Sequence, residues 1–220
     1  MEQGIEKRTY SQMAYEAVKE GLIRGAYDGY VNGRRIAAEL GMGYSPVREA
    51  LQRLDQEGLL KRIPNNGYFV REIEWKDINR IFQVRECVEL FIWDQLFEAL
   101  DGTILARMER LHEREIEAAA RQEFAVCREI DIEFHGILPE LYRNQDLLYL
   151  YYNSREKQMI CVNQPLMLYN QEAILEHGHI LKQVRAGKKD ETLELLRRHI
   201  LNFRERMQRH IRRDGVYQDG

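Results

Sequence analysis

The sequence predicts a mainly α-helical protein built in two parts. Residues 75–220 consist of long amphipathic stretches in which apolar residues recur with the period of a helix, and no strand-like alternation interrupts them. Residues 1–74 consist of shorter helical segments separated by glycines, and they end in a hairpin-like stretch. The chain has 220 residues, of which 44% are hydrophobic and 31% charged, a composition typical of a globular protein with a core.

Three short helices are expected in the N-terminal part. The first ends at Gly25, and its apolar residues recur at helical spacing: Met13, Ala17, Val18 and Leu22. The second follows Asn32, a suitable N-cap, and ends at Gly41. Pro46 opens the third, whose apolar face is formed by Val47, Ala50, Leu51 and Leu54.

A hairpin follows these helices. Residues 59–72 read LLKRIPNNGYFVRE, two strand-like runs around an Asn-Gly turn. Two helices, a tight turn, a third helix and a hairpin occur in this order in a winged helix-turn-helix. Because the apolar pattern changes near residues 72–76, we expect a winged helix-turn-helix domain at 1–74 and an all-helical bundle at 75–220.

The predicted bundle contains roughly six helices. Short breaks separate its amphipathic stretches at Asp101-Gly102, Arg143-Asn144, Asn163-Gln164-Pro165 and Ala186-Gly187. No stretch has the ~18 consecutive apolar residues that a membrane span requires. Three widely spaced cysteines without a C-x-x-C pattern, Cys87, Cys127 and Cys161, are typical of reduced thiols, and we expect a cytoplasmic protein.

The charge of the chain is unevenly distributed. Its net charge is −3, yet residues 31–71 carry seven basic and four acidic side chains, a local charge of +3. A protein that binds DNA needs a local basic patch and not a high overall pI. The first part of the chain therefore qualifies as a DNA-binding domain.

The outer face of the third helix carries candidate base-reading side chains. Ser45, Arg48 and Gln52 form one stripe, and Tyr44 lies at the N-terminal tip, the end that meets the bases in helix-turn-helix proteins. Arginine at 48 suits guanine, and glutamine at 52 suits adenine. Each could be an ordinary solvated side chain, but their occurrence in one winged-helix order favours DNA contact. The remaining candidates lie on the preceding helix and the hairpin: Arg34, Arg35, Lys61, Arg62, Asn66 and Gly67.

A second constellation lies in the helical part. In the stretch EIDIEFHGIL, Asp131 and His135 are four residues apart and share one helix face. They form either a solvated ion pair or half of a metal site, because His177 and His199 follow 22 residues apart on later helices. One aspartate and three histidines suit zinc, nickel or cobalt. Spacing alone leaves the alternative of ordinary core histidines open.

The stretch GYSPVREALQRLDQEGLLKRIPNNGYFV resembles the signature of the GntR family of bacterial transcription regulators. Residues 46–51, 54–60 and 67–70 match it closely. The resemblance implies DNA contacts by Arg48 and Arg34. Two family arginines are absent: Tyr44 stands in the usual Ser-Arg-Thr segment, and Asn66 precedes the wing glycine. These departures predict a shifted operator preference and a weaker salt dependence of binding.

The helical part resembles the FCD ligand-binding domain of the FadR branch of that family. The shared pattern is D-x-x-x-H, then E-H-x-x-I, then a final H-I, and it implies that Asp131, His135, His177 and His199 bind a divalent metal, zinc or nickel first of all. Arg85 and Glu89 match the R-x-x-x-E that opens the domain. Arg85 is either a partner for a carboxylate effector or half of a buried pair with Glu89.

Three functions are compatible with these patterns. The first is a homodimeric repressor that reads two half-sites about 34–36 Å apart and responds to a small carboxylate anchored on the metal. The second is a regulator with a purely structural metal and no effector. The third is a metalloenzyme, which is disfavoured because Glu133 and Glu176 are placed to point away from the ligands and no H-E-x-x-H is present. We therefore expect no catalytic residues and no membrane partner.

Overall fold

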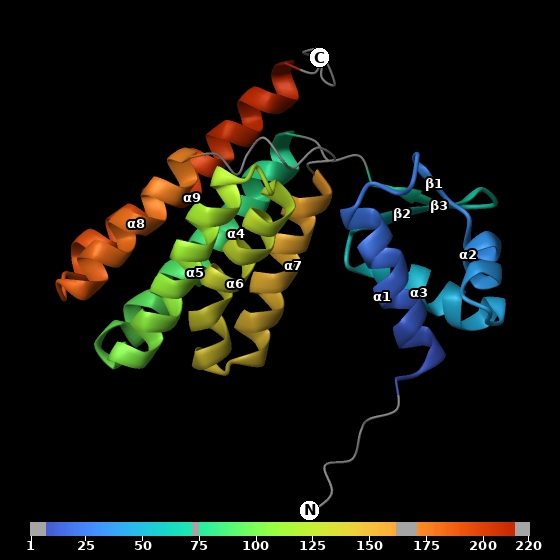
Figure 1. Cartoon of the computed structure of the whole chain (residues 1–220). Helices are drawn as coiled ribbons and strands as arrows, with labels where there is room; N and C mark the ends of the chain where they lie inside the picture. Colours follow the sequence, from blue (N-terminus) through green and yellow to red (C-terminus); the bar gives the residue numbers. More distant parts are fainter. Residues whose placement is uncertain (1–7, 72–74, 162–170, 214–220) are drawn as a thin grey trace, which may run out of the picture. The chain divides into compact units, whose positions relative to one another are not determined.

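The computed structural model describes residues 8–71, 75–161 and 171–213 (Figure 1). Contacts divide the chain into two compact units, Met1–Ile73 with Met159–Asn163 and Glu74–Gln158 with Gln164–Gly220. The predicted fold class is confirmed: three helices and a small sheet come first, and an all-helical bundle follows. In the described ranges, no helix is both long and apolar enough to span a bilayer.

The first unit has the winged helix-turn-helix order. Its elements are α1 (Tyr10–Ile23), β1 (Tyr30–Val31), α2 (Gly33–Glu39), α3 (Tyr44–Gln56), β2 (Leu60–Ile63) and β3 (Gly67–Val70). Asn32 caps α2 as predicted, because its side chain accepts a hydrogen bond from the Arg35 backbone N–H at 3.1 Å. Thr9 caps α1 in the same way.

The core of this unit lies between α1, α2 and α3. The predicted inner face of α3 is buried, from Val47 to Leu54. The prediction for α1 was wrong at Met13, which is exposed, whereas Ala14 and Tyr15 are buried. The buried face of α1 therefore includes Tyr15 and not Met13. The Tyr15 ring packs inward, and its hydroxyl donates a hydrogen bond to Glu57 Oε2 at 2.7 Å.

The wing is an antiparallel sheet with the strand order β1-β3-β2. The predicted hairpin is confirmed, but its turn is not centred on Asn66-Gly67. The Asn66 N–H donates to the Ile63 carbonyl at 3.0 Å, which places Pro64 and the left-handed Asn65, at φ 64°, at the centre of the turn. Gly67, at φ 99°, already pairs with Ile63 in the sheet. β1 was not predicted because it has only two residues; it pairs with β3 through Tyr30 and Phe69. Tyr30 also covers Gly67, where a Cβ would lie 3.1 Å from the ring.

The second unit is a helical bundle. Its elements are α4 (Trp75–Leu96), η1 (Phe97–Ala99), α5 (Gly102–Ala120), α6 (Phe124–Tyr142), α7 (Gln145–Cys161), α8 (Gln171–Arg185) and α9 (Lys189–Arg213). Asp101 caps α5, as its break predicted. The break before α6 was missed because it has neither glycine nor proline; Gln122, at φ 59°, makes the turn. The break predicted at 163–165 lies outside the described residues.

Helix packing brings distant segments together. α5 packs against α6 and α8, while α9 packs against α4 and α8. The interior where these helices meet is polar as well as apolar. Its buried polar and charged side chains include Arg85, Glu89, Glu115, Asp131, His135, Arg155, His177 and His199. Buried charges persist only when they are paired or bind a ligand, so this cluster is the place to look for a site.

Candidate metal centre

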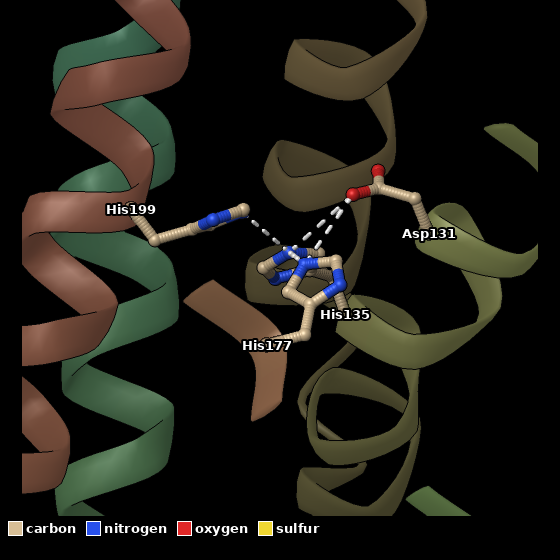
Figure 2. A group of neighbouring side chains, drawn as sticks. All are labelled: Asp131, His135, His177 and His199. Carbon is tan, nitrogen blue, oxygen red and sulfur yellow. Dashed lines mark hydrogen bonds and ion pairs between the residues drawn. The ribbon is translucent and has the colours of Figure 1, made fainter. Parts of the chain in front are cut away.

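Four side chains converge in the bundle interior (Figure 2). Asp131 and His135 come from α6, His177 from α8 and His199 from α9, and each is at most 2% exposed. The Nε2 atom of His135 lies 3.2 Å from that of His177 and 3.1 Å from that of His199. Asp131 Oδ1 lies 3.7 Å and 3.6 Å from the first two nitrogens. The structure thus brings together all four residues that the sequence singled out.

Each histidine is held from behind by a carboxylate. Glu115 Oε2 lies 2.8 Å from Nδ1 of His177, and Glu176 Oε2 lies 2.8 Å from Nδ1 of His199. Glu89 Oε2 lies 2.9 Å from Nδ1 of His135, at ion-pair distance but without hydrogen-bond alignment. A carboxylate behind Nδ1 keeps the proton on that nitrogen and turns the Nε2 lone pair inward, as it does for histidines that bind metals.

The inward-facing atoms are therefore acceptors. Three Nε2 lone pairs and one carboxylate oxygen face one another, and neutral imidazoles held in this tautomer offer no donor between them. One proton can satisfy a single pair of these atoms, whereas a divalent cation satisfies all four. The nitrogen and oxygen donor set suits zinc or nickel, so the residues fit a metal ion.

The pKa values agree with this arrangement. Burial lowers the pKa of His135 and brings that of His199 to about 3, so both rings are neutral near pH 7. Burial alone would lower the pKa of His177, but Glu115 and Asp131 outweigh it and raise the value. Burial would likewise raise the pKa of Asp131, yet Arg155 and the histidines hold it far below its usual range. Asp131 is anionic, and because the pKa of His177 is raised, a metal ion competes with a proton for its ring.

Buried donors from α4 and α7 border the cluster. Arg155 pairs with Asp131 through Nη2. Arg85 is 1% exposed; its Nε donates to Glu89 Oε1 and its Nη1 to Gln158 Oε1, both at 2.7 Å. The buried pair with Glu89 is therefore present. Yet Nη2 of Arg85 and the hydroxyl of Tyr151 have no hydrogen-bond partner among residues 8–71, 75–161 and 171–213, so a further acceptor could still be bound there.

Three members of this site escaped sequence reasoning. Glu115 and Arg155 occur in ordinary charged stretches, and Glu176 was expected only to point away from the ligands because it precedes His177. It does avoid the inner face, but it reaches His199 on the next helix. Only a contact between helices reveals that role. Glu133 lies outside the cluster and pairs with Arg107 at 3.2 Å.

The candidate DNA-reading side chains are displayed on the first unit. On α3, Tyr44, Ser45, Arg48 and Gln52 are exposed, opposite the buried apolar face. The candidates on α2 and the wing are exposed as well: Arg34, Arg35, Lys61, Arg62 and Asn66. Gly67 is half-buried. Arg35 has an exposed partner, Glu39, at 3.3 Å.

Comparison with protein families decides the identity of the chain. Residues 80–202 match the FCD domain, and residues 10–70 match the bacterial regulatory proteins of the gntR family. The chain belongs to the GntR family, in its FCD-containing branch. Its FCD domain is the helical unit that contains the cluster of one aspartate and three histidines, a buried group that could bind a metal.

Proteins that are similar to this chain in sequence are transcriptional regulators as well. An uncharacterized HTH-type transcriptional regulator, YdhC of Bacillus subtilis, is 25% identical over 87% of this chain and 86% of its own. The Nta operon transcriptional regulator of Aminobacter aminovorans is 29% identical over 54% of this chain and 56% of its own. These relatives are transcriptional regulators and not enzymes.

Solved structures share the fold. A GntR regulator from Rhodococcus sp. RHA1 superposes with a TM-score of 0.76 at 20% identity, over 94% of this chain and 99% of its own. E. coli McbR/YncC gives a TM-score of 0.71 at 20% identity, over 93% and 99%. At this identity the likeness concerns the fold alone.

Proposed function

We propose that this GntR regulator is a homodimeric repressor whose binding to DNA is changed by a small carboxylate effector. The effector binds at a divalent ion, zinc or nickel, held by Asp131, His135, His177 and His199. The observation that carries the proposal is the convergence of three Nε2 atoms and one carboxylate oxygen, from side chains at most 2% exposed, in a domain of the FCD type. A divalent cation would satisfy all four of these buried atoms, whereas a proton satisfies only one pair.

The side chains around the four ligands have separate roles in the proposed effector site. A bound divalent ion with four protein ligands can offer an open coordination position to a carboxylate oxygen. Glu89, Glu115 and Glu176 orient the histidines, and Arg155 holds Asp131. Arg85 and Tyr151 supply buried donors, through Nη2 and the hydroxyl, to the polar atoms of the effector. A buried donor without an acceptor costs about 1–3 kcal/mol, which an effector would recover.

The DNA-binding part of the proposal rests on the exposed face of α3. We assign the winged helix-turn-helix domain to residues 1–74 and the FCD domain to residues 75–220. Arg48 and Gln52 read base edges together with Tyr44 and Ser45. The remaining DNA contacts are phosphate or minor-groove contacts from α2 and the wing: Arg34, Arg35, Lys61, Arg62, Asn66 and Gly67.

The effector can switch DNA binding only if it favours one state of the protein. A ligand with equal affinity for the DNA-bound and free states shifts nothing, however tightly it binds. Coupling between two sites typically amounts to about 1–3 kcal/mol, a change of about 5- to 150-fold in operator affinity. We expect this range for the effector of this regulator.

The test is a screen of small carboxylates by thermal unfolding, on metal-stripped protein and on protein reloaded with zinc or nickel. An acid at about 100 times its dissociation constant adds about 2.7 kcal/mol to the free energy of unfolding. The matched variants are Tyr151→Phe, which removes only the buried hydroxyl, and Tyr152→Phe, whose hydroxyl donates to exposed Glu140.

Stabilisation by an acid that requires the metal, and that is lost in Tyr151→Phe but kept in Tyr152→Phe, supports the proposal. A second candidate is a purely structural metal, which the burial of all four ligands at 2% exposure or less favours. That candidate holds if metal stabilises the protein and no acid adds to it. If neither zinc nor nickel binds, both are refuted.

A further inference from the structure

A second group of potential ligands adjoins the buried cluster. His112 and Glu115, both on α5, and His177 on α8 place one nitrogen or oxygen atom each within 4.8 Å of one another. The side chain of His112 is 17% exposed, whereas the four inner ligands are at most 2% exposed. This outer group, His112, Glu115 and His177, therefore connects the buried centre with the surface of the bundle.

Glu115 lies between the two histidines of the outer group. Its Oε2 is 2.8 Å from Nδ1 of His177 and 3.8 Å from Nδ1 of His112. The shorter contact is a hydrogen bond, but the longer one is not. Nδ1 of His112 is buried and has no hydrogen-bond partner in the described part of the chain. A buried ring nitrogen left in this way is available to bind a ligand.

The backbone of α8 makes room for His112. Gly178 directly follows His177, and a Cβ at that position would lie 2.9 Å from Nε2 of His112. Glycine inside a helix costs about 0.5–1 kcal/mol relative to alanine, so its presence needs a reason. Here the reason is steric, because any side chain at 178 would force the His112 ring to move.

We propose that the outer group is a second metal-binding site, through which divalent ions reach the buried centre. It offers two imidazoles and one carboxylate, a donor set for zinc, nickel or cobalt. An ion bound there takes the place of the proton on Nδ1 of His177, which is released to solvent. His177 belongs to both groups, with Nδ1 on the outer side and Nε2 on the inner side. A metal site that is closed to solvent needs an entry path, and His112 is the exposed end of this one. The inference rests on the proposed metal centre.

The experiment follows the uptake of Co²⁺ by the metal-stripped, full-length protein in a stopped-flow spectrometer, through the visible absorbance of the bound ion. We expect His112→Gln to take up Co²⁺ several-fold more slowly than the unmodified chain, because the first ligand on the entry path is lost. The final absorbance is expected to be unchanged. The matched control is His179→Gln, which removes an exposed histidine on α8 and should leave the rate as it is.

A second variant, Gly178→Ala, displaces His112 without removing its imidazole and should slow uptake in the same way. The proposal is overturned if His112→Gln takes up Co²⁺ at the unmodified rate, or if it lowers the equilibrium affinity while the uptake rate stays the same. Uptake of metal by the unmodified chain distinguishes a failure of the proposed metal centre from a failure of the proposed entry path. If that chain binds no Co²⁺, zinc or nickel, the metal centre itself is refuted; if it does, a negative result concerns the entry path alone.

Discussion

Replacing Glu176 by glutamine tests whether the carboxylates behind the histidines control metal binding. Both oxygens of Glu176 are acceptors: Oε2 faces Nδ1 of His199 at 2.8 Å, and Oε1 accepts from Asn202 Nδ2 at 2.7 Å. Arg206 approaches both oxygens at 3.3 Å. Glutamine has a single acceptor oxygen, so its amide group must face one of these donors. Either His199 loses its proton acceptor or the contact with Asn202 is lost.

The magnitude follows from the role of Glu176 as an outer partner of a metal ligand. Loss of such a partner typically lowers metal affinity 10- to 100-fold, which is about 1.4–2.7 kcal/mol. With metal at about 1,000 times the dissociation constant of the unmodified chain, binding stabilises that chain by about 4.1 kcal/mol. The variant would retain between about 1.4 and 2.7 kcal/mol. The metal-induced rise in Tm should shrink by roughly 3–10 °C.

Differential scanning calorimetry of metal-stripped and zinc-loaded protein measures this difference, and isothermal titration calorimetry gives the affinity directly. The control is Glu172→Gln, which removes the same charge one turn earlier on α8. Glu172 is 69% exposed and lies 3.8 Å from Arg206, its single ion-pair contact in the described residues. If Glu176→Gln and Glu172→Gln keep the same metal-induced shift, Glu176 does not orient His199 and the reasoning is wrong.

Three further outcomes are expected. Arg48→Ala should weaken operator binding in fluorescence anisotropy by about 1–3 kcal/mol, whereas Arg53→Ala, whose guanidinium lies over the Tyr15 ring at 4.0 Å, should not. Because Tyr44 and Asn66 replace cationic residues, the slope of log K against log salt should be shallower than about −5.4, the value for six phosphate contacts. In metal-stripped protein, the pKa of His199, lowered to about 3, makes the unfolded state bind more protons between pH 6.5 and about 3. Urea unfolding should therefore show that the free energy of unfolding decreases as the pH is lowered from 6.5 to about 3. The decrease should be smaller in His199→Gln.

The fold was predictable wherever its signals are local. The N-cap at Asn32 and the apolar face of α3 each depend on neighbours within a few residues, and both predictions are confirmed. The failure on α1 occurred where tertiary contacts decide. Met13 and Tyr15 are both apolar enough to face inward, and partners on α3 and just beyond it, Arg53 and Glu57, hold the tyrosine there.

The candidate metal centre shows the same division between local and distant signals. The pair Asp131 and His135 is visible in the sequence because one helical turn separates the two residues. The contacts of Glu115 with His177 and of Glu176 with His199 join different helices, at sequence separations of 62 and 23 residues. Charged residues at such positions look like any solvated helix face until the packing of α5, α8 and α9 is known.

The buried face of α7 bears on the choice between a structural metal and an effector site. A structural ion needs the four inner ligands and the carboxylates behind them, and nothing more. The buried side chains of α7 that border the site, however, are the polar Tyr151, Arg155 and Gln158. Arg155 forms an ion pair with Asp131, and Gln158 accepts a hydrogen bond from Arg85. The hydroxyl of Tyr151 and Nη2 of Arg85, however, have no acceptor in the described residues. Since apolar residues of similar size would avoid the cost of burying these two donors, their presence favours a bound effector over a structural metal.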